Sequence, residues 1–259
     1  MGILNVTPDS FSDGGAYSDG AAAVAAGLAM RDAGADIVDI GGESTRPGAE
    51  PVSSEEERRR VLPVIGALAR AGILVSVDTR HAATMKAALD AGAGIVNDVS
   101  ALTHDPAAAP LLACRDCAVI LMHMRGDPAT MQSLAAYDDV PAEVARELAE
   151  RVAAAERAGI ARARLAVDPG FGFAKRSAQS LALLRGLGAL TALGLPIVVG
   201  VSRKGFIGQV TGVADARARG PGSLVAGLFA LSQSAAILRV HDVSAISQAL
   251  RVREAIMNI

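Results

Sequence analysis

Short apolar runs that end on a polar residue recur along the whole chain. Runs of this kind suit strands buried on both faces of a parallel sheet, and a following proline or glycine stops the strand. The clearest run is Leu165–Asp168, whose carboxylate is followed by Pro169 and Gly170. The pattern predicts eight strands, over residues 2–7, 35–41, 73–78, 95–99, 118–124, 165–168, 196–201 and 237–241.

Helical stretches separate most of these strands. Ser53, followed by Glu55 and Glu56, predicts the start of the second helix, because a serine hydroxyl accepts a first-turn N–H and acids are favourable there. The charged run 55–60 is predicted to be a solvated helix face whose charges pair with one another. The other predicted helices cover residues 18–33, 81–91, 107–113, 141–158 and 222–235, and the last helix ends near Met257.

The alternation of strand and helix predicts the fold class. About eight βα units at a spacing of ~30 residues favour an α/β fold of the closed (β/α)8 TIM barrel type, which commonly forms a single domain of about this length. An open doubly wound sheet is the alternative. Such sheets usually have fewer strands and a glycine fingerprint after the first strand, which this chain lacks. We therefore expect residues 1–259 to form one domain.

Composition narrows the class of protein further. Hydrophobic residues make up 51% of the 259 residues, which allows a large core, and a formal net charge of −2 gives no sign of a nucleic-acid partner. No run approaches the ~18 apolar residues of a membrane span, and we expect a cytoplasmic protein. Cys114 and Cys117 lack a second cysteine pair or histidines at ligand spacing, so we expect two buried, reduced thiols rather than a redox or zinc site.

Polar residues stand at the carboxyl ends of nearly all the predicted strands. Each residue alone has an ordinary explanation, because Asp and Asn often cap turns or helices and a lone His is usually structural. In a parallel barrel, however, these ends face a common mouth, so together they predict one cavity. The set is Asn5, Thr7, Asp39, Asp78, Asn97, Asp98, His123, Asp168, Lys204, Arg239 and His241.

The types of residue in this set indicate the ligand. The carboxylates of Asp78 and Asp168 suit a flat heterocycle with N–H donors on its edge, and Lys204 suits a ring oxygen or nitrogen. Arg239 and His241, two residues apart on one strand, suit a phosphate, with Arg46 assisting from a loop. No Ser or Cys stands beside a base, and no dense metal cage is apparent, although Mg²⁺ could arrive with a phosphate substrate. The set favours catalysis by positioning and leaving-group stabilisation.

Eight motifs, spread through the chain in order, closely resemble those of dihydropteroate synthases. They are residues 2–15 (GILNVTPDSFSDGG), 41–48 (GGESTRPG), 76–79 (SVDT), 97–98 (ND), 121–124 (LMHM), 168–173 (DPGFGF), 202–204 (SRK) and 239–242 (RVHD). The family's (β/α)8 fold agrees with the barrel predicted from spacing. Members usually carry a segment before the first strand, which this chain nearly opens on, so we expect either a less well plugged far end of the barrel or further residues ahead of the first strand.

The resemblance implies a transferase of folate biosynthesis. Such an enzyme joins 6-hydroxymethyl-7,8-dihydropterin pyrophosphate to p-aminobenzoate, which sulfonamide drugs mimic, and releases pyrophosphate. It requires Mg²⁺ and is commonly a homodimer. Because the aryl amine is a weak nucleophile and the departure of pyrophosphate is the difficult step, we expect an SN1-like order in which pyrophosphate leaves first.

The resemblance also implies a role for each matching residue. Asp168 resembles the carboxylate that accepts two hydrogen bonds from the pterin, and Lys204 the cation at the pterin carbonyl and N5. The full pterin set is Asp78, Asn97, Met122, Asp168, Phe173, Gly200, Lys204 and Arg239. The pyrophosphate set is Asn5, Thr45, Arg46, Arg239 and His241, with Asn5 as the Mg²⁺ ligand. The p-aminobenzoate set is Phe11, Thr45, Pro47, Ser202 and Lys204.

The residues expected to act in catalysis are Asn5, Asp78, Asp168, Lys204, Arg239 and His241, and Asp9 and Asp13 are expected to help order the closed site. Two alternatives stay open. The pterin-binding barrel of a corrinoid-dependent methyltransferase is similar at the Asp and Asn positions but has no use for the pyrophosphate set. A catalytically silent pterin-binding paralogue would bind the ring without turnover.

Overall fold

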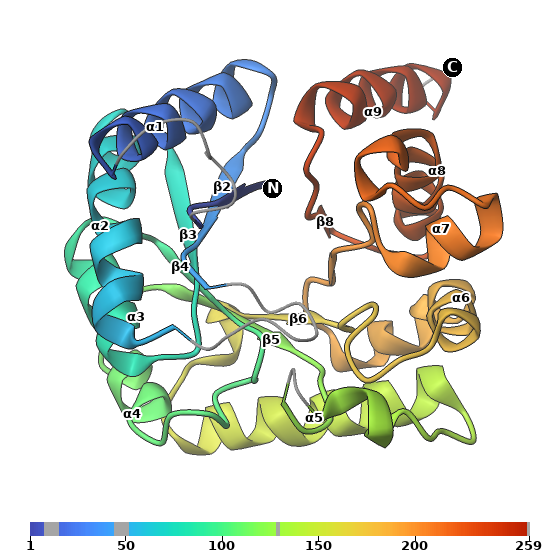
Figure 1. Cartoon of the computed structure of the whole chain (residues 1–259). Coiled ribbons are helices and arrows are strands. Elements are labelled where there is room, and N and C mark those ends of the chain that lie inside the picture. The colour runs from blue at the N-terminus through green and yellow to red at the C-terminus, as the bar shows by residue number, and fades with distance from the viewer. Residues whose placement is uncertain (8–15, 44–51, 128–129, 258–259) are drawn as a thin grey trace.

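The computed structural model describes residues 1–7, 16–43, 52–127 and 130–257 of the chain. Its centre is a set of parallel strands, and helices surround them (Figure 1). The strands are β1 Gly2–Asn5, β2 Ile37–Gly41, β3 Leu74–Asp78, β4 Ile95–Asp98, β5 Ala118–Met122, β6 Leu165–Asp168, β7 Val198–Val199 and β8 Ile237–Leu238. They match the eight predicted strands in order, although β7 and β8 are shorter than predicted.

The strands close into a barrel. β1 to β6 form a continuous parallel sheet in sequence order, and β7 pairs with β8 in parallel. A single parallel bridge between Val167 and Ile197 joins β6 to the start of β7. On the other side, the Ile3 N–H donates to the Val240 carbonyl and the Val240 N–H to the Met1 carbonyl, both at 2.9 Å. The predicted (β/α)8 barrel is therefore confirmed, and the open sheet is wrong.

The helices follow one another around the strands in chain order, from α1 through α5 to α9 (Figure 1). They are α1 Ala16–Asp32, α2 Ser54–Arg70, α3 Ala82–Asp90, α4 Ala108–Ala113, α5 Val140–Arg157, α6 Ser177–Arg185, α7 Gly205–Thr211, α8 Gly220–Ser232 and α9 Val243–Met257. The sequence pattern did not predict α6 and α7, which span nine and seven residues and so offer only two turns of periodicity. No helix in the described part of the chain is long and apolar enough to cross a membrane.

The start of α2 tests two predictions. The Ser53 hydroxyl accepts the Glu56 N–H at 3.2 Å, which confirms the predicted cap. Arg59 and Arg60 both pair with Glu56, as expected of a self-paired face. Glu57 is the exception, because it is fully buried and accepts hydrogen bonds from Thr79 and Thr84. The prediction of a solvated charged run is wrong at this residue, which faces the barrel rather than solvent.

Two apolar cores stabilise the barrel. The larger one lies between strands and helices, and includes fully buried residues such as Ile40, Leu68 and Leu121. A smaller cluster of Met1, Ile95, Ile120 and Val198 packs separately. Since burial of one such side chain contributes about 1.5–3 kcal/mol, these clusters supply most of the favourable term in folding. The small cluster shows that the part of the interior expected to be less well plugged holds apolar side chains.

The cysteines differ from each other. Cys117 is buried and its thiol pKa is raised by burial, whereas Cys114, which follows the last residue of α4, is exposed. Both are free thiols. The prediction of two buried thiols is therefore wrong for Cys114, because the end of this six-residue helix faces outward.

The register of the strands places the predicted polar residues at one end of the barrel. Asn5 lies opposite Gly41, Gly41 opposite Asp78, and Asp78 opposite Asn97. On the next pair of strands, Met122 lies opposite Asp168. Because all the strands are parallel, their carboxyl ends form one rim.

Candidate active site

A cavity of about 970 Å³ opens at this rim. Glycine at positions 172 and 200 and small side chains elsewhere leave room between the polar groups. Eleven of the predicted site residues line it: Asn5, Asp78, Asn97, Met122, Asp168, Phe173, Gly200, Ser202, Lys204, Arg239 and His241. The expectation that these residues gather around one cavity is confirmed.

The remaining predicted site residues cannot be placed in this way. Phe11, Thr45, Arg46 and Pro47 lie outside the described residues, as do Asp9 and Asp13. Their roles stay predictions.

The acceptor side of the cavity consists of Asp78, Asn97 and Asp168. Burial raises the pKa of Asp168, whose Oδ1 accepts the Gly170 N–H at 2.7 Å. Burial also raises the pKa of Asp78 to about 7, with Asp39 acting in the same direction and Arg239 opposing it. A carboxylate removed from water gains most from a ligand that offers several N–H donors, because such donors replace the lost hydration.

The loop after β6 is closely specified by its glycines. Gly170 has a φ of +68°, and a Cβ at this position would lie 2.0 Å from the carbonyl oxygen of His123, so only glycine fits. The loop then places two aromatic rings differently. Phe171 is buried against Phe206, with ring centroids 6.5 Å apart, whereas Phe173 lies in the cavity wall with the Lys204 ammonium 4.4 Å from its centroid.

The cationic side comes from the residues after β7 and β8. Lys204 directly precedes α7. Arg239 donates to Asp39 Oδ2 from Nε and to Asp78 Oδ2 from Nη2, both at 2.6 Å. Burial alone would lower the pKa of Arg239, but the two carboxylates raise it above its ordinary value. The guanidinium, expected in both the pterin and the pyrophosphate sets, here pairs with two carboxylates, of which Asp39 is fully buried.

His241 and Ser202 join the ends of the last two strands. The Ser202 hydroxyl lies 3.0 Å from His241 Nδ1 and accepts the His241 backbone N–H at 3.3 Å. This contact leaves His241 Nε2 on the other side of the ring from Ser202. Both residues line the cavity, so the pair places an imidazole beside Arg239, as the sequence predicted.

Three of the polar residues at strand ends do not line the cavity. Asp98 and His123 point away because each directly follows an inward residue, and neighbouring residues of a strand face opposite sides. Asp98 instead caps a turn through the N–H groups of Ser100 and Leu102. Asp39 is fully buried beneath the cavity. For these three residues the prediction of a shared cavity is wrong.

Sequence reasoning missed several cations in the wall, among them Lys175 and Arg219. Lys175 is only 3% exposed, and burial lowers its pKa to about 7. The signal that could have found it is a lysine two residues after the DPGFGF motif, separated from it only by Ala174. Arg219 braces the loop before α8 through hydrogen bonds to the carbonyls of Val213, Ala214 and Arg203. Nothing in the sequence distinguishes it from its neighbour Arg217.

The side chains around the cavity that could bind a metal ion decide whether Mg²⁺ fits this site. Within the described residues, no group of three His, Cys, Asp or Glu side chains could hold a metal ion. The oxygen donors at the rim next to the cationic side include the amide of Asn5. Mg²⁺ commonly keeps several waters and binds through one or two protein oxygens together with substrate phosphates. Asn5 therefore fits a metal ion that arrives with a phosphate.

The comparisons with known proteins agree on one family. A family model described as "Pterin binding enzyme" matches residues 1–241. The dihydropteroate synthase of Neisseria meningitidis serogroup C is 49% identical over 259 residues, which cover 99% of this chain and 92% of that protein.

Solved structures give the same result. The structure of Xanthomonas albilineans dihydropteroate synthase with 4-aminobenzoic acid superposes with a TM-score of 0.94 at 50% identity, and covers 100% of this chain and 93% of its own. The structure of the same species' enzyme in complex with 7,8-dihydropteroate has a TM-score of 0.91 at 47% identity, with the same coverage.

Proposed function

Because the chain belongs to the dihydropteroate synthases, within the pterin-binding enzymes, we propose that its rim cavity holds the pterin substrate between the acceptor and cationic sides. Enzymes of this family transfer the dihydropterin, through its exocyclic CH2 carbon, from pyrophosphate to the amine of p-aminobenzoate: the C–O bond to pyrophosphate breaks and a C–N bond forms. The single observation that carries the proposal is the convergence of Asp78, Asn97, Asp168 and Lys204 on one cavity.

The acceptor side fits the edge of a pterin. Asp168 is ionised when it accepts two N–H groups from the ring, and its Gly170 bond fixes the direction of the carboxylate. Asp78 and Asn97 stand next to each other across the β3–β4 ladder and reach the same face. Met122, Gly200 and Phe173 form the walls against the flat ring, and Lys204, held over Phe173, meets the carbonyl and N5.

The cationic side fits the pyrophosphate. Arg239 and His241 lie next to the position where the bridging oxygen gains charge as the C–O bond breaks, and Arg46 and Thr45 are proposed to join them. Asn5 would hold a Mg²⁺ ion that arrives with the substrate, and this ion would supply charge neutralisation to the leaving group. The dihydropterin tolerates positive charge on its exocyclic carbon because Asp78 and Asp168 are close. This arrangement supports an SN1-like order.

The amine substrate completes the site. We place p-aminobenzoate between Lys204 and Ser202, with Phe11, Pro47 and Thr45 as further contacts. The aryl amine is neutral near pH 7 and needs no strong base, so the reaction does not require the Ser202–His241 contact to act as a nucleophile–base pair.

A pyrophosphate-release assay tests the proposal. The full chain is supplied with the dihydropterin pyrophosphate and Mg²⁺, with and without p-aminobenzoate. Release that depends on the amine supports the synthase. Tight pterin binding without release would instead identify a silent paralogue, and binding of a methylated pterin with no pyrophosphate release would favour the methyltransferase barrel.

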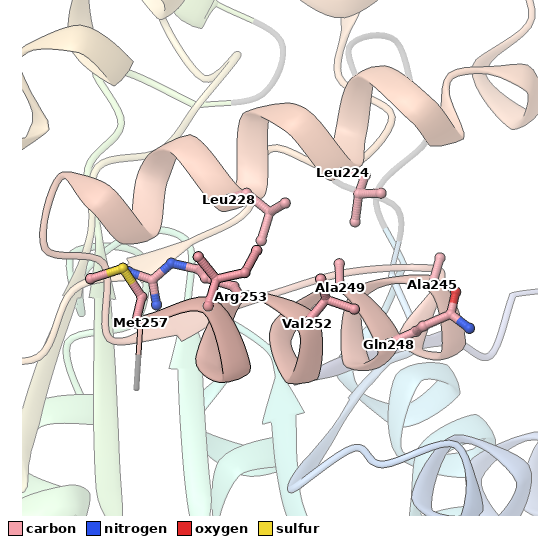
Figure 2. Close-up of a pocket in the computed structure, with 9 residues that line it drawn as sticks. Leu224, Leu228, Ala245, Gln248, Ala249, Val252, Arg253 and Met257 are labelled. Atoms are coloured by element: carbon pink, nitrogen blue, oxygen red, sulfur yellow. The ribbon is translucent and has the colours of Figure 1, made fainter. Parts of the chain in front are cut away.

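The α8–α9 face supports a homodimer. Leu224 and Leu228 of α8 and Ala249 and Val252 of α9 line an apolar groove between the two helices (Figure 2). Large apolar side chains stand exposed on or beside it, including Val225 at 69%, Ile256 at 65% and Val252 at 56%. Exposed apolar surface of this kind commonly marks an interface, and a second copy of the chain offers a matching surface through two-fold symmetry.

We further propose that residues 1–259 work as one domain in the cytoplasm. The closure of β8 against β1 joins the two ends of the chain into one barrel. A pyrophosphate ester carries several charges and does not cross a bilayer unaided, which supports a site in the compartment where the substrate is made.

A further inference from the structure

Lys175 lies in the cavity wall, 3% exposed, with its amino group surrounded by acceptors. Nζ lies 2.8 Å from His123 Nδ1, 3.1 Å from the Gly170 carbonyl oxygen and 3.0 Å from the Phe173 carbonyl oxygen. The three N–H groups of an ammonium therefore each have a partner. Because Nδ1 of His123 is the acceptor, its Nε2 carries the hydrogen, and this nitrogen lies 2.9 Å from Glu147.

The two carbonyl contacts hold the loop that forms the pterin wall. Gly170 and Phe173 are joined by a turn in which the Phe173 N–H donates to the Gly170 carbonyl at 3.1 Å. Gly170, Gly172 and Ala174 all have positive φ, with Ala174 at +49°. An alanine in this region is strained, so the loop needs an outside brace to keep its shape.

The series of contacts from Lys175 through His123 ends at Glu147, which lies on helix α5. Glu147 also accepts hydrogen bonds from Arg125, which pairs with Glu143 at 2.8 Å and lies 3.8 Å from the Tyr137 ring centroid. Burial alone would raise the pKa of Glu147, but His123 and Arg125 lower it to about 2. The carboxylate is therefore charged and holds the imidazole in one orientation.

Two amides connect the same segments from the outside. Gln132 Nε2 donates to the Gly172 carbonyl at 3.2 Å, and Gln179 Nε2 donates to the Ala135 carbonyl at 3.0 Å. The segment after β5 is thus fixed to the loop after β6 on both sides. The loop's position depends on α5 and β5 as well as on its own strand.

Stability alone does not explain a lysine at this position. Burying an ammonium costs free energy, and a methionine of similar length would fill the space without that cost. What a methionine cannot do is hold two loop carbonyls and one imidazole in fixed directions. The lysine's use is therefore geometric.

We propose that Lys175 is a positioning residue, which through the Gly170 and Phe173 carbonyls sets the direction of Asp168 and the place of Phe173, and that the His123–Glu147 pair fixes Lys175 in turn. The proposal rests on the proposed function, because its ligand is the dihydropterin. Gly170 connects Lys175 directly to Asp168. Its carbonyl accepts a hydrogen bond from Lys175, and its N–H donates to the Asp168 carboxylate.

The test compares Lys175→Met with Lys86→Met in the full chain. Lys86 is an exposed lysine on α3, paired with Asp90 and remote from the cavity, so it is a matched control. Lys175→Met is expected to raise KM for the dihydropterin pyrophosphate about tenfold or more, a loss comparable to one hydrogen bond to a charged group. KM for p-aminobenzoate and kcat are expected to stay within about threefold of the control. A pterin KM equal to the control, or both KM values rising together, would overturn the proposal.

A second pair covers the case in which Lys175→Met does not fold. Glu147→Gln keeps the shape but removes the charge that holds His123, and Glu150→Gln on the same helix, more than half exposed, is its control. We expect Glu147→Gln to raise the pterin KM about threefold with no change for p-aminobenzoate, and an unchanged pterin KM would count against the proposal.

Calorimetry with the dihydropterin pyrophosphate alone separates the two proposals. If the unmodified chain binds the pterin but releases no pyrophosphate, the proposed function fails. The Lys175 proposal is then still decided by whether Lys175→Met weakens binding relative to Lys86→Met.

Discussion

The two arcs of the barrel contribute opposite chemistry. The acceptor arc, β1 to β6, is a continuous sheet that supplies Asn5, Asp78, Asn97 and Asp168 to the cavity. The cationic arc, β7 and β8, consists of two-residue strands and supplies Lys204, Arg239 and His241 from the segments that follow them. The acceptors are thus held in a ladder of backbone hydrogen bonds, whereas the cations are held by turns and side chains.

This division matches the two parts of the substrate. A flat ring is recognised by fixed hydrogen-bond partners, and a regular sheet fixes them well. A leaving group moves during the reaction, and long cationic side chains on less regular segments can follow it. Removing a cation should therefore slow the chemistry, and removing an acceptor should weaken binding of the ring.

The largest effect is expected on the cationic arc. Lys204→Ala and Arg239→Ala should each slow turnover by about 10²-fold or more, because each removes charge stabilisation in the transition state. Steady-state kinetics, with circular dichroism to confirm the fold, measure this. A near-native rate in either variant would show that the reaction takes place elsewhere.

The next effect is expected on the acceptor arc. Asp168→Asn keeps the shape but offers one acceptor oxygen in place of two, so KM for the dihydropterin should rise about 10- to 100-fold. The kcat should fall by a smaller factor than in Lys204→Ala. If Asp168→Asn lowers kcat and leaves the pterin KM unchanged, the division of work between the arcs is wrong.

Lys175 offers a further test of the comparison, because it is a buried lysine in the acceptor arc. Burial lowers its pKa from the ordinary 10.5 to about 7, so between these values the unfolded chain binds one more proton than the folded chain. The free energy of unfolding therefore increases as pH rises from about 7 to 10.5, by at most about 1.4 kcal/mol per pH unit. This increase is lost again as pH falls back to about 7 and below, where both states bind the proton. Denaturant unfolding at several pH values measures it.

The control for this measurement is Lys175→Met, which lacks the titrating group. The unfolding free energy of the unmodified chain, minus that of Lys175→Met, should increase from pH 7 to pH 10. A constant difference across this range would mean that Lys175 keeps its proton and the ordinary pKa.

The smallest effect on activity is expected at the outer face of the cationic arc. Val252→Asp places a charge in the apolar α8–α9 groove and should convert the proposed dimer to a monomer, as sedimentation velocity would show. The kcat should change less than about twofold, because this face is remote from the rim. A monomeric unmodified chain, or a Val252→Asp chain that remains dimeric, would contradict the proposed interface.

Much of this organisation could be predicted from the sequence. The strands are read from apolar runs, and in a parallel barrel the ends of the strands must meet, which is why Asp78, Asn97 and Asp168 were placed correctly. The sequence analysis predicts the wrong side-chain direction for Asp98 and His123, which point away from the cavity. One residue more or less along a strand reverses the direction of the side chain, and the sequence does not fix the strand's last inward position.

Other features depend on contacts between distant segments. Arg239 meets carboxylates that are 200 and 161 residues away in sequence, and no local pattern indicates that it holds both of them. The buried lysine at position 175 has the same limit in part, because one of its partners, His123, is 52 residues away in sequence. Short helices such as α7 give too few turns for a periodic signal.

The hydrogen bonds from Arg239 to Asp39 and Asp78 affect the affinity of the site for the pterin ring. A pterin that takes an oxygen of Asp78 competes with a guanidinium already 2.6 Å away. Docking is then a substitution of one partner for another, and the net affinity is smaller than the new hydrogen bonds alone would suggest. In the proposed function, Nη2 of Arg239 then becomes available to the pyrophosphate while Nε keeps its bond to Asp39, so binding of the ring would prepare the other half of the site.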